Sequence, residues 1–363
     1  MSEHFDVAII GAGPAGSAAA RRLASSGCRV ALVERTHFEE PRVGESLPPA
    51  VQPLLSELGV WRDFMQLDPL PSYGTRSVWG GPEPEVHSHL GSAWGCGWHV
   101  DRQAFDRMLA ACAEQAGATL FCGTSFKKCE EAGDAWLLRL SGGLTLRARA
   151  VIDATGRSAR VATGLAAQRL LLDRLVGVAM QFDSVDTARE GYVQVETSGD
   201  GWWYTAPVPH GRMMAMIMTD SDLCGRDRLS REPEWAARLT TAPATSARLS
   251  SASVLWGPRV FFAASQRLRR SDVARRWIAV GDAALAVDPI SGSGVIRALK
   301  SARAGAETVQ AMLEGQTAEA IGAYETGRDA ECTEYLKERA MYYGIEHRWS
   351  ESMFWKRRAL VST

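Results

Sequence analysis

Apolar and polar residues follow one another in segments that predict strands joined by helices. The first unit spans residues 5–34. It contains an apolar run of strand length (5–10), a stretch of helical propensity that Gly27 ends (17–25), and a second apolar run (29–34). This order predicts a parallel βαβ unit at the start of the chain.

The middle and the end of the chain show two further patterns. Residues 175–182, 191–209 and 211–220 are strand-like runs separated by turn residues, which predicts an antiparallel sheet. Residues 295–313 have helical character and follow a short apolar strand, residues 275–280. These patterns predict an α/β domain with a sheet-rich domain inserted into it.

Three glycines and an acid stand at fixed positions in the first unit. "GAGPAG" places Gly11, Gly13 and Gly16 in G-x-G-x-x-G spacing between strand and helix. The first glycine permits a tight turn, the second lets the backbone approach a pyrophosphate, and the third allows close packing of helix on strand. The helix N-terminus then points N–H groups at the phosphates. Glu34 ends the second strand, where an acid accepts hydrogen bonds from a ribose diol, so the unit predicts a dinucleotide site.

A second glycine cluster, "GDAALAVDPISGSG", lies far along the chain at residues 281–294. An NAD enzyme would place its nicotinamide site closer to the first cluster. If the far half of the dinucleotide is a ribityl-flavin, Asp282 can accept a hydrogen bond from a ribityl hydroxyl. The N–H groups around Gly292 and Gly294 can then stabilise negative charge at the flavin N1/O2 edge. We therefore expect the two clusters to hold opposite ends of one FAD.

The chain resembles the FAD-dependent monooxygenases of the para-hydroxybenzoate hydroxylase type in "GAGPAG", "GDAALAVDP" and "SGSG". "RVGESLPP" (42–49) narrows this to the branch shared with flavin-dependent halogenases. "VIDATGRSARV" (151–161) resembles the D-G-x-x-S-x-x-R stretch of the hydroxylases, with Ala154 in place of glycine. Residues 342–358 resemble the C-terminal helical tail of the same branch. The resemblance covers essentially the whole chain.

The residue pattern and the resemblance together suggest roles for individual residues. A loop with Glu45 and Ser46 would lie along the flavin ring, with helix capping as the alternative for Ser46. His99 is the candidate histidine for acid–base chemistry, with a structural role as the alternative. Trp202 and Tyr204 would stack on an aromatic substrate, unless they only pack the sheet. The implied cofactor-binding residues are Gly11, Gly13, Pro14, Ala15, Gly16, Glu34, Arg35, Arg42, Ser46, Arg102, Asp153, Gly156, Gly281, Asp282, Pro289, Gly292, Ser293 and Gly294.

The predicted fold class is α/β. A Rossmann-like FAD-binding domain of the glutathione-reductase type carries an inserted mixed or antiparallel substrate sheet and a C-terminal helical tail. The predicted FAD-binding domain comprises residues 1–75, 100–164 and 266–320, the substrate domain residues 76–99 and 165–265, and the C-terminal helices residues 321–363.

Composition narrows the function classes. A hydrophobic share of 46% and a charged share of 23% are those of an ordinary globular protein. A net charge of −1 argues against nucleic acid or a membrane surface as partner, and no apolar run reaches the length of a membrane span. The N-terminus lacks the features of an export signal, so we expect a cytoplasmic protein. Seven cysteines without a C-x-x-C motif indicate free thiols and no metal site.

Two differences from the halogenases favour hydroxylation. The halogenases carry a lysine downstream of the G-E-S stretch, whereas no lysine precedes Lys127 here. Their W-x-W-x-I-P stretch is replaced by "WWYTAP" (202–207). We therefore predict a monooxygenase and no halogenase. In such enzymes reduced flavin and O₂ form a C4a-hydroperoxide, whose terminal oxygen is attacked by an electron-rich aromatic substrate.

Three hypotheses of function stay open at this level. The chain's size and "GESLPP" resemble the small flavoproteins that mature cysteine tryptophylquinone enzymes, which implies hydroxylation of a partner protein's tryptophan as a post-translational modification. A small aromatic or polyketide-like metabolite is the alternative substrate. The second hypothesis is a reductase of the geranylgeranyl-reductase type, which needs no O₂, and the third is a non-catalytic flavoprotein that acts as a binding chaperone. The chain has no second nucleotide cradle, so electrons would come from transiently bound NAD(P)H or, as reduced flavin, from a separate flavin reductase.

Overall fold

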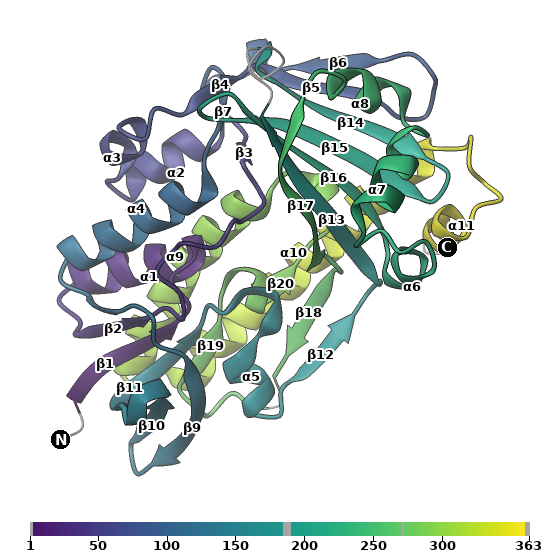
Figure 1. The fold of residues 1–363 in the computed structure, drawn as a ribbon. Helices are drawn as coiled ribbons and strands as arrows, with labels where there is room; N and C mark the ends of the chain where they lie inside the picture. The colour runs from purple at the N-terminus through teal and green to yellow at the C-terminus, as the bar shows by residue number, and fades with distance from the viewer. Residues whose placement is uncertain (1–2, 184–189, 271, 360–363) are drawn as a thin grey trace.

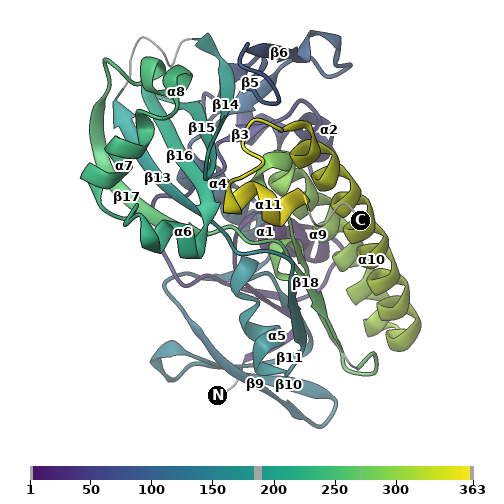
Figure 2. The same cartoon turned by 90° about the vertical axis from the view of Figure 1, so that its right-hand side faces the viewer.

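The fold contains two large sheets (Figure 1), and the computed structural model describes residues 3–183, 190–270 and 272–359. The sheet that includes β1 lies at the lower left of Figure 1, and the sheet that includes β13 to β17 lies at the upper right. The long helix α10 (Thr317–Ile345) packs against α9 (Gly294–Leu313) along one side of the molecule (Figure 2). No helix within the described ranges is long and apolar enough to cross a bilayer.

The first sheet is built on parallel strands from distant parts of the chain. Its order is β8-β2-β1-β11-β10-β9, and β19 pairs with β11. β1 runs parallel to β2 and β11, and β11 runs parallel to β19, so the carboxyl ends of these strands share one edge. The strands are β1 (Glu3–Ile10), β2 (Val30–Val33), β8 (Thr119–Phe121), β9 (Phe126–Ala132), β10 (Ala135–Leu140), β11 (Thr145–Asp153) and β19 (Trp277–Ala279).

Three helices cover one face of this sheet. α1 (Pro14–Ser25), α4 (Arg102–Gln115) and α9 share a core with Ile9, Leu32 and Ile152 from the strands. α1 begins earlier than residue 17, where the sequence predicted its start, because proline is well suited to the first turn of a helix. The predicted Rossmann-like α/β fold with an additional sheet and C-terminal helices is confirmed.

The second sheet has the order β17-β13-β16-β15-β14-β5-β6. Its central strands are antiparallel, whereas β14 runs parallel to β5. Four strands coincide with the apolar runs of the sequence, because turn residues separate those runs. The strands are β5 (Gly74–Val78), β6 (Glu85–Ser88), β13 (Leu175–Asp183), β14 (Tyr192–Ser198), β15 (Gly201–Val208), β16 (Arg212–Asp220) and β17 (Ser253–Phe262).

The two faces of the second sheet are covered differently (Figure 2). Helices α6 (Ser221–Arg226), α7 (Glu232–Leu239) and α8 (Pro243–Arg248) cover one face. The other face packs against α11 (Met353–Ala359), against Val43, and against Ile290 of the second glycine cluster. We call it the flavin-side face, because it lies toward the loops for which the sequence predicted flavin contact.

Two small sheets and three short helices complete the fold. β3 (Ser46–Leu47) and β4 (Leu70–Ser72) both pair with β7 (Gly97–His99), which fixes the "GESLPP" segment in the molecule. The remaining elements are β12 (Gln168–Leu171), β18 (Gln266–Arg269), β20 (Leu285–Ala286), α2 (Val51–Glu57), α3 (Trp61–Met65) and α5 (Arg160–Gly164).

Candidate flavin site

The three glycines of the first cluster have different surroundings. Gly11 has a φ of +102°, and a Cβ there would lie 2.3 Å from the Ala154 carbonyl oxygen. A Cβ on Gly16 would lie 1.8 Å from the Gly11 carbonyl oxygen, so both positions require glycine for packing within the chain. A Cβ on Gly13 would meet nothing within 4 Å. Gly13 therefore borders open space at the N-terminus of α1, where a pyrophosphate can approach the backbone.

Glu34 lies buried at the end of β2, beside the first cluster. Its Oε2 accepts a hydrogen bond from the Ala12 amide at 3.0 Å, and its Oε1 accepts one from the Thr36 hydroxyl at 2.8 Å. We call the first glycine cluster (residues 11–16) together with the N-terminus of α1 the cradle. These bonds hold the Glu34 carboxylate beside the cradle and leave acceptor capacity for a ribose diol. The neighbouring Arg35 is exposed to solvent.

The second glycine cluster adjoins the first. Gly281 has a φ of +59°, and a Cβ there would lie 2.8 Å from Cβ of Ala15 in α1. After Pro289, the chain turns at Gly292, and a Cβ on Gly292 or Gly294 would meet nothing within 4 Å. Open space thus borders both clusters, and the N-termini of α1 and α9 stand beside it, with Ser293 as the N-cap of α9. These residues fit an extended FAD whose pyrophosphate lies at α1 and whose flavin end lies at α9.

A buried carboxylate orders the loop that carries Glu45. Asp106 pairs with Arg42 at 2.7 Å and with Arg102 at 3.1 Å. Arg102 also donates to the Val43 carbonyl oxygen at 2.8 Å, and a Cβ on Gly44 would lie 2.4 Å from its guanidinium. In this structure Arg102 therefore holds the loop backbone itself. The sequence analysis missed Asp106, although an acid four residues after Arg102 on a helix predicts this ion pair.

Asp153 and Gly156 organise the turn after β11. The buried Asp153 carboxylate accepts hydrogen bonds from the Thr155 amide at 3.0 Å and the Ala162 amide at 2.9 Å. Burial raises the pKa of Asp153, while these hydrogen bonds lower it. Gly156 supports the turn with a φ of +64°. Asp153 thus shapes the turn through bonds within the chain, a role that the sequence analysis did not foresee.

Arg157 connects this turn to the second glycine cluster. It donates to the Val287 carbonyl oxygen at 2.7 Å and lies 3.3 Å from the Asp282 carboxylate. Asp282 is partly exposed and retains room to accept a bond from a ribityl hydroxyl. No sequence pattern singled out Arg157.

Glu45 lies opposite the flavin-side face of the second sheet. Its side chain is 1% exposed, and its Oε2 accepts a hydrogen bond from the Gly44 amide at 2.9 Å. Its Oε1 has no hydrogen-bond partner among the described residues. Burial raises the pKa of Glu45, while interactions with the Tyr204 hydroxyl and with Arg102 lower it. The Tyr204 hydroxyl lies close to both Glu45 and Ser46, so we take these three side chains as the candidates for proton transfer.

His99 pairs with Ser46 across β7 and β3 and is 0% exposed. Burial lowers its pKa to about 3, so the imidazole is neutral at physiological pH. A neutral, enclosed imidazole is poorly placed to exchange protons with a substrate. The structure thus favours the structural alternative for His99.

His99 should make the stability of the protein depend on pH. Its folded-state pKa of about 3 lies below the unfolded value of 6.5, because the buried imidazole resists protonation. Its contribution to the stability of the folded state is therefore fully present above pH 6.5 and is lost as pH falls toward 3, since the unfolded chain takes up the proton first. We expect His99→Phe to flatten this acid limb by as much as about 4 kcal/mol, measured by urea unfolding across the pH range. His210→Asn, at an exposed histidine, is the control and should leave the slope unchanged. An unchanged slope in His99→Phe would contradict the assignment.

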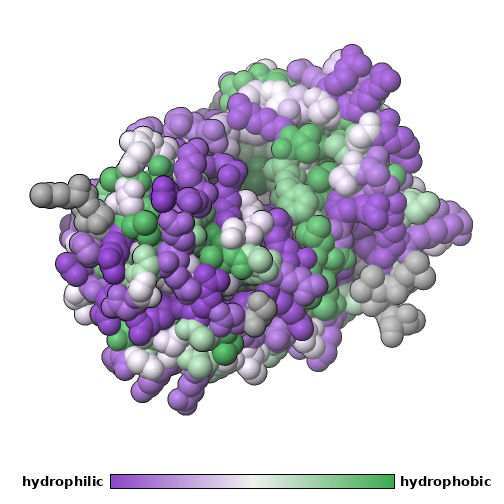
Figure 3. Space-filling view, turned by 90° about the horizontal axis from the view of Figure 1, so that it is seen from below, coloured by the Kyte–Doolittle hydropathy of each residue, from purple (hydrophilic) through white to green (hydrophobic). Residues whose placement is uncertain are grey.

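The flavin-side face is rich in aromatic residues. Tyr204, Trp256 and Phe261 lie partly buried on it, together with Val43 and Ile290 from the loops. From below, the surface is hollowed at its middle, and hydrophobic residues gather in the hollow (Figure 3).

Trp202 differs from Tyr204 in its surroundings. It is 1% exposed, and its Nε1 donates to the Tyr343 hydroxyl at 3.0 Å. Trp202 therefore packs the sheet. Tyr204 is partly buried on the flavin-side face and stays a candidate for substrate contact.

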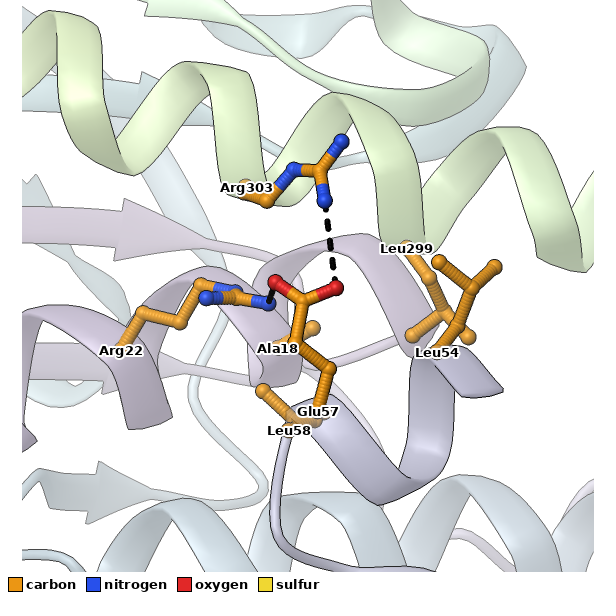
Figure 4. Close-up of a pocket in the computed structure, with 7 residues that line it drawn as sticks. All are labelled: Ala18, Arg22, Leu54, Glu57, Leu58, Leu299 and Arg303. Atoms are coloured by element: carbon orange, nitrogen blue, oxygen red, sulfur yellow. Dashed lines mark hydrogen bonds and ion pairs between the residues drawn. The ribbon is translucent and has the colours of Figure 1, made fainter. Parts of the chain in front are cut away.

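A shallow depression between α1, α2 and α9 lies apart from these groups (Figure 4). Its acid, Glu57, pairs with Arg22 at 2.7 Å and with Arg303 at 3.1 Å, so the carboxylate is paired within the chain. We interpret it as a helix-packing contact. Its lining residues are Ala18, Arg22, Leu54, Glu57, Leu58, Leu299 and Arg303.

Curated proteins similar to this chain include both oxidoreductases and halogenases. "Putative FAD-dependent oxidoreductase LodB" of Marinomonas mediterranea is 28% identical over 99% of this chain and 98% of its own length. The 1H-pyrrole-2-carbonyl-[peptidyl-carrier protein] chlorinase of Pseudomonas fluorescens is 29% identical over 84% of this chain and 75% of its own. Digeranylgeranylglycerophospholipid reductase 1 of Methanothermobacter thermautotrophicus is 26% identical over 90% and 82%.

Solved structures show the same fold. The flavin-dependent halogenase CmlS superposes with a TM-score of 0.88 at 25% identity, over 99% of this chain and 68% of its own. The peptidyl tryptophan dihydroxylase QhpG superposes with a TM-score of 0.73 at 24% identity, over 98% and 78%. The halogenases among these proteins do not support the prediction that this chain is no halogenase.

The family described as FAD binding domain matches residues 4–338. This range includes both glycine clusters, the loop with Glu45 and the whole second sheet. The chain therefore belongs to the FAD-binding-domain family of flavoproteins and is a relative of flavin-dependent halogenases and oxidoreductases.

Proposed function

We propose that the protein is an FAD-dependent monooxygenase that hydroxylates an electron-rich aromatic ring, the indole of a tryptophan in a partner protein. The proposal rests on the composition of the flavin-side face. This face has aromatic side chains, Tyr204 lies close to Glu45, and no lysine of the described ranges lies on it. Every lysine is exposed elsewhere, on β9, α9, α10 or α11: Lys127, Lys128, Lys300, Lys337 and Lys356.

The chain's residues can perform three tasks in this reaction. Bound FAD, once reduced by NAD(P)H or by an external reductase, would supply the activation of O₂. Trp256 and Phe261, partly buried on the flavin-side face, are aromatic side chains that can contact an aromatic ring. Burial raises the pKa of Glu45, so its carboxyl can hold a proton at a higher pH than an exposed carboxyl would, and the Tyr204 hydroxyl lies close to it. The second sheet would cover the flavin ring and the substrate, and so keep water away from the reacting atoms.

Halogenation is the second candidate, because the chlorinase of Pseudomonas fluorescens is 29% identical to this chain over most of its length. The missing lysine on the flavin-side face argues against it. A reductase function draws support from the digeranylgeranylglycerophospholipid reductase, but a reductase has no need of O₂.

One experiment separates these functions. The holoprotein is incubated with a reductant, isotopically labelled O₂, chloride and bromide, and a peptide that contains a single tryptophan. We expect labelled oxygen on the indole, detected by mass spectrometry, and no product from the same peptide with phenylalanine in place of tryptophan. Halogen on the indole would replace the proposal by halogenation. Turnover without O₂ would indicate the reductase, and absence of any indole product would refute tryptophan hydroxylation.

A further inference from the structure

One helix supplies three side chains that hold the base of the second glycine cluster. Tyr335, Arg339 and Tyr343 follow one another at intervals of four residues on α10, so they share one face of the helix. All three are buried, and all three approach Asp288, the residue just before Pro289. Asp288 itself is 0% exposed.

Both the carboxylate and the backbone amide of Asp288 are held by polar contacts. The Tyr343 hydroxyl donates to its Oδ2 at 2.8 Å, and Arg339 lies 3.6 Å from the same oxygen. Its backbone amide donates to the Tyr335 hydroxyl at 3.0 Å, while its Oδ1 accepts the Ile290 amide at 3.0 Å. Through Ile290 the carboxylate shapes the turn that leads to Gly292 and α9.

The phenol of Tyr343 also reaches the second sheet. It accepts a hydrogen bond from the Trp202 indole at 3.0 Å, so one hydroxyl connects β15 to Asp288. Arg339 makes a parallel connection, since it pairs with Asp173 at 3.2 Å, just before β13. Both connections run from the substrate sheet, through α10, to the turn that borders the flavin end.

We propose that Tyr343 is a positioning residue, which sets the geometry of the flavin-bordering turn, stabilises the Asp288 carboxylate beneath it and couples that turn to the sheet. Without its hydroxyl, Asp288 loses a charge-assisted hydrogen bond, and its negative charge is less compensated. The turn then holds the flavin less well, and the nearby negative charge disfavours addition of electrons to it. This inference goes beyond the proposed reaction and concerns FAD alone.

Tyr343→Phe tests the proposal, with Tyr324→Phe as the matched control. Tyr324 is a buried tyrosine of the same helix, but its hydroxyl donates to the Ala279 carbonyl oxygen at 2.8 Å, away from Asp288. The measurements are the FAD dissociation constant of the apoprotein, the reduction potential of bound FAD, and the melting temperature. We expect both variants to lose similar stability. Only Tyr343→Phe should weaken FAD binding, by about tenfold, and lower the potential.

Equal FAD affinity and potential in Tyr343→Phe and Tyr324→Phe would overturn the proposal. Should Tyr343→Phe fold poorly, Trp202→Phe gives the answer, because it removes the indole donor to the same hydroxyl and keeps an aromatic ring in the core, with the melting temperature recording the loss of packing. Trp202→Phe is expected to lower the potential by a smaller amount, and an unchanged potential there would equally refute the coupling. These measurements need no substrate, so they stand or fall independently of the hydroxylation assay.

Discussion

A Gly13→Val variant is expected to keep the thermal stability of the apoprotein and to weaken FAD binding by at least about a hundredfold. The backbone at Gly13 has φ −70° and ψ −176°, a conformation open to valine, and a Cβ there would meet no non-neighbouring atom within 4 Å. The valine would instead occupy the space in which the pyrophosphate meets the N-terminus of α1. Fluorescence titration of apoprotein with FAD, together with thermal unfolding, measures both quantities.

Gly16→Ala is the contrasting variant at the same cradle. Its new Cβ would lie 1.8 Å from the Gly11 carbonyl oxygen, so strand and helix must move apart. We expect a loss of stability of about 3 kcal/mol even without cofactor. If Gly13→Val bound FAD as tightly as the wild type, the assignment of the FAD pyrophosphate to the space beside Gly13 would be wrong.

Glu45→Gln is expected to lower the rate of indole hydroxylation by at least about a hundredfold and to leave FAD affinity unchanged. Glutamine preserves the size of the side chain and its contact with the Gly44 amide, but it cannot release a proton. Burial raises the pKa of Glu45, so the wild-type rate should fall as pH rises through that value, when the carboxyl loses its proton. Glu45→Gln should lack this limb in a pH profile of product formation.

Glu57→Gln is the control for this prediction. Glu57 lies on α2, paired with Arg22 and Arg303 in the depression of Figure 4, and it has no contact with the flavin-side face. We expect a wild-type rate and pH profile for this variant. Full activity and an unchanged profile in Glu45→Gln would show that proton transfer proceeds through another group.

Local patterns made the fold and the cradle predictable. Glycine spacing and an acid at the end of a strand follow from the needs of one short βαβ unit, so Gly11, Gly16 and Glu34 could be placed from the sequence. The strands of the second sheet were predictable as well, because turn residues separate their apolar runs. The start of α1 at Pro14 was missed because the glycine-rich stretch hides it.

Contacts between distant segments could not be read in this way. The ion pair of Arg42 with Asp106 and the link from Trp202 through Tyr343 to Asp288 join residues that are far apart in the chain. The sequence showed Trp202 as a candidate for stacking on a substrate, because nothing nearby indicated that Tyr343 covers it. The regular spacing of Tyr335, Arg339 and Tyr343 was visible, but its partner carboxylate was not.

The contact between Gly281 and Ala15 has a consequence for biosynthesis. During synthesis, residues 11–16 leave the ribosome long before β19 and Gly281 are made. Until then the nascent chain cannot form the contact between Gly281 and Ala15. Such late, non-local closure slows folding and exposes apolar surface in the meantime. Because FAD would bind only the folded chain and lie against both glycine clusters, its binding should stabilise this late contact.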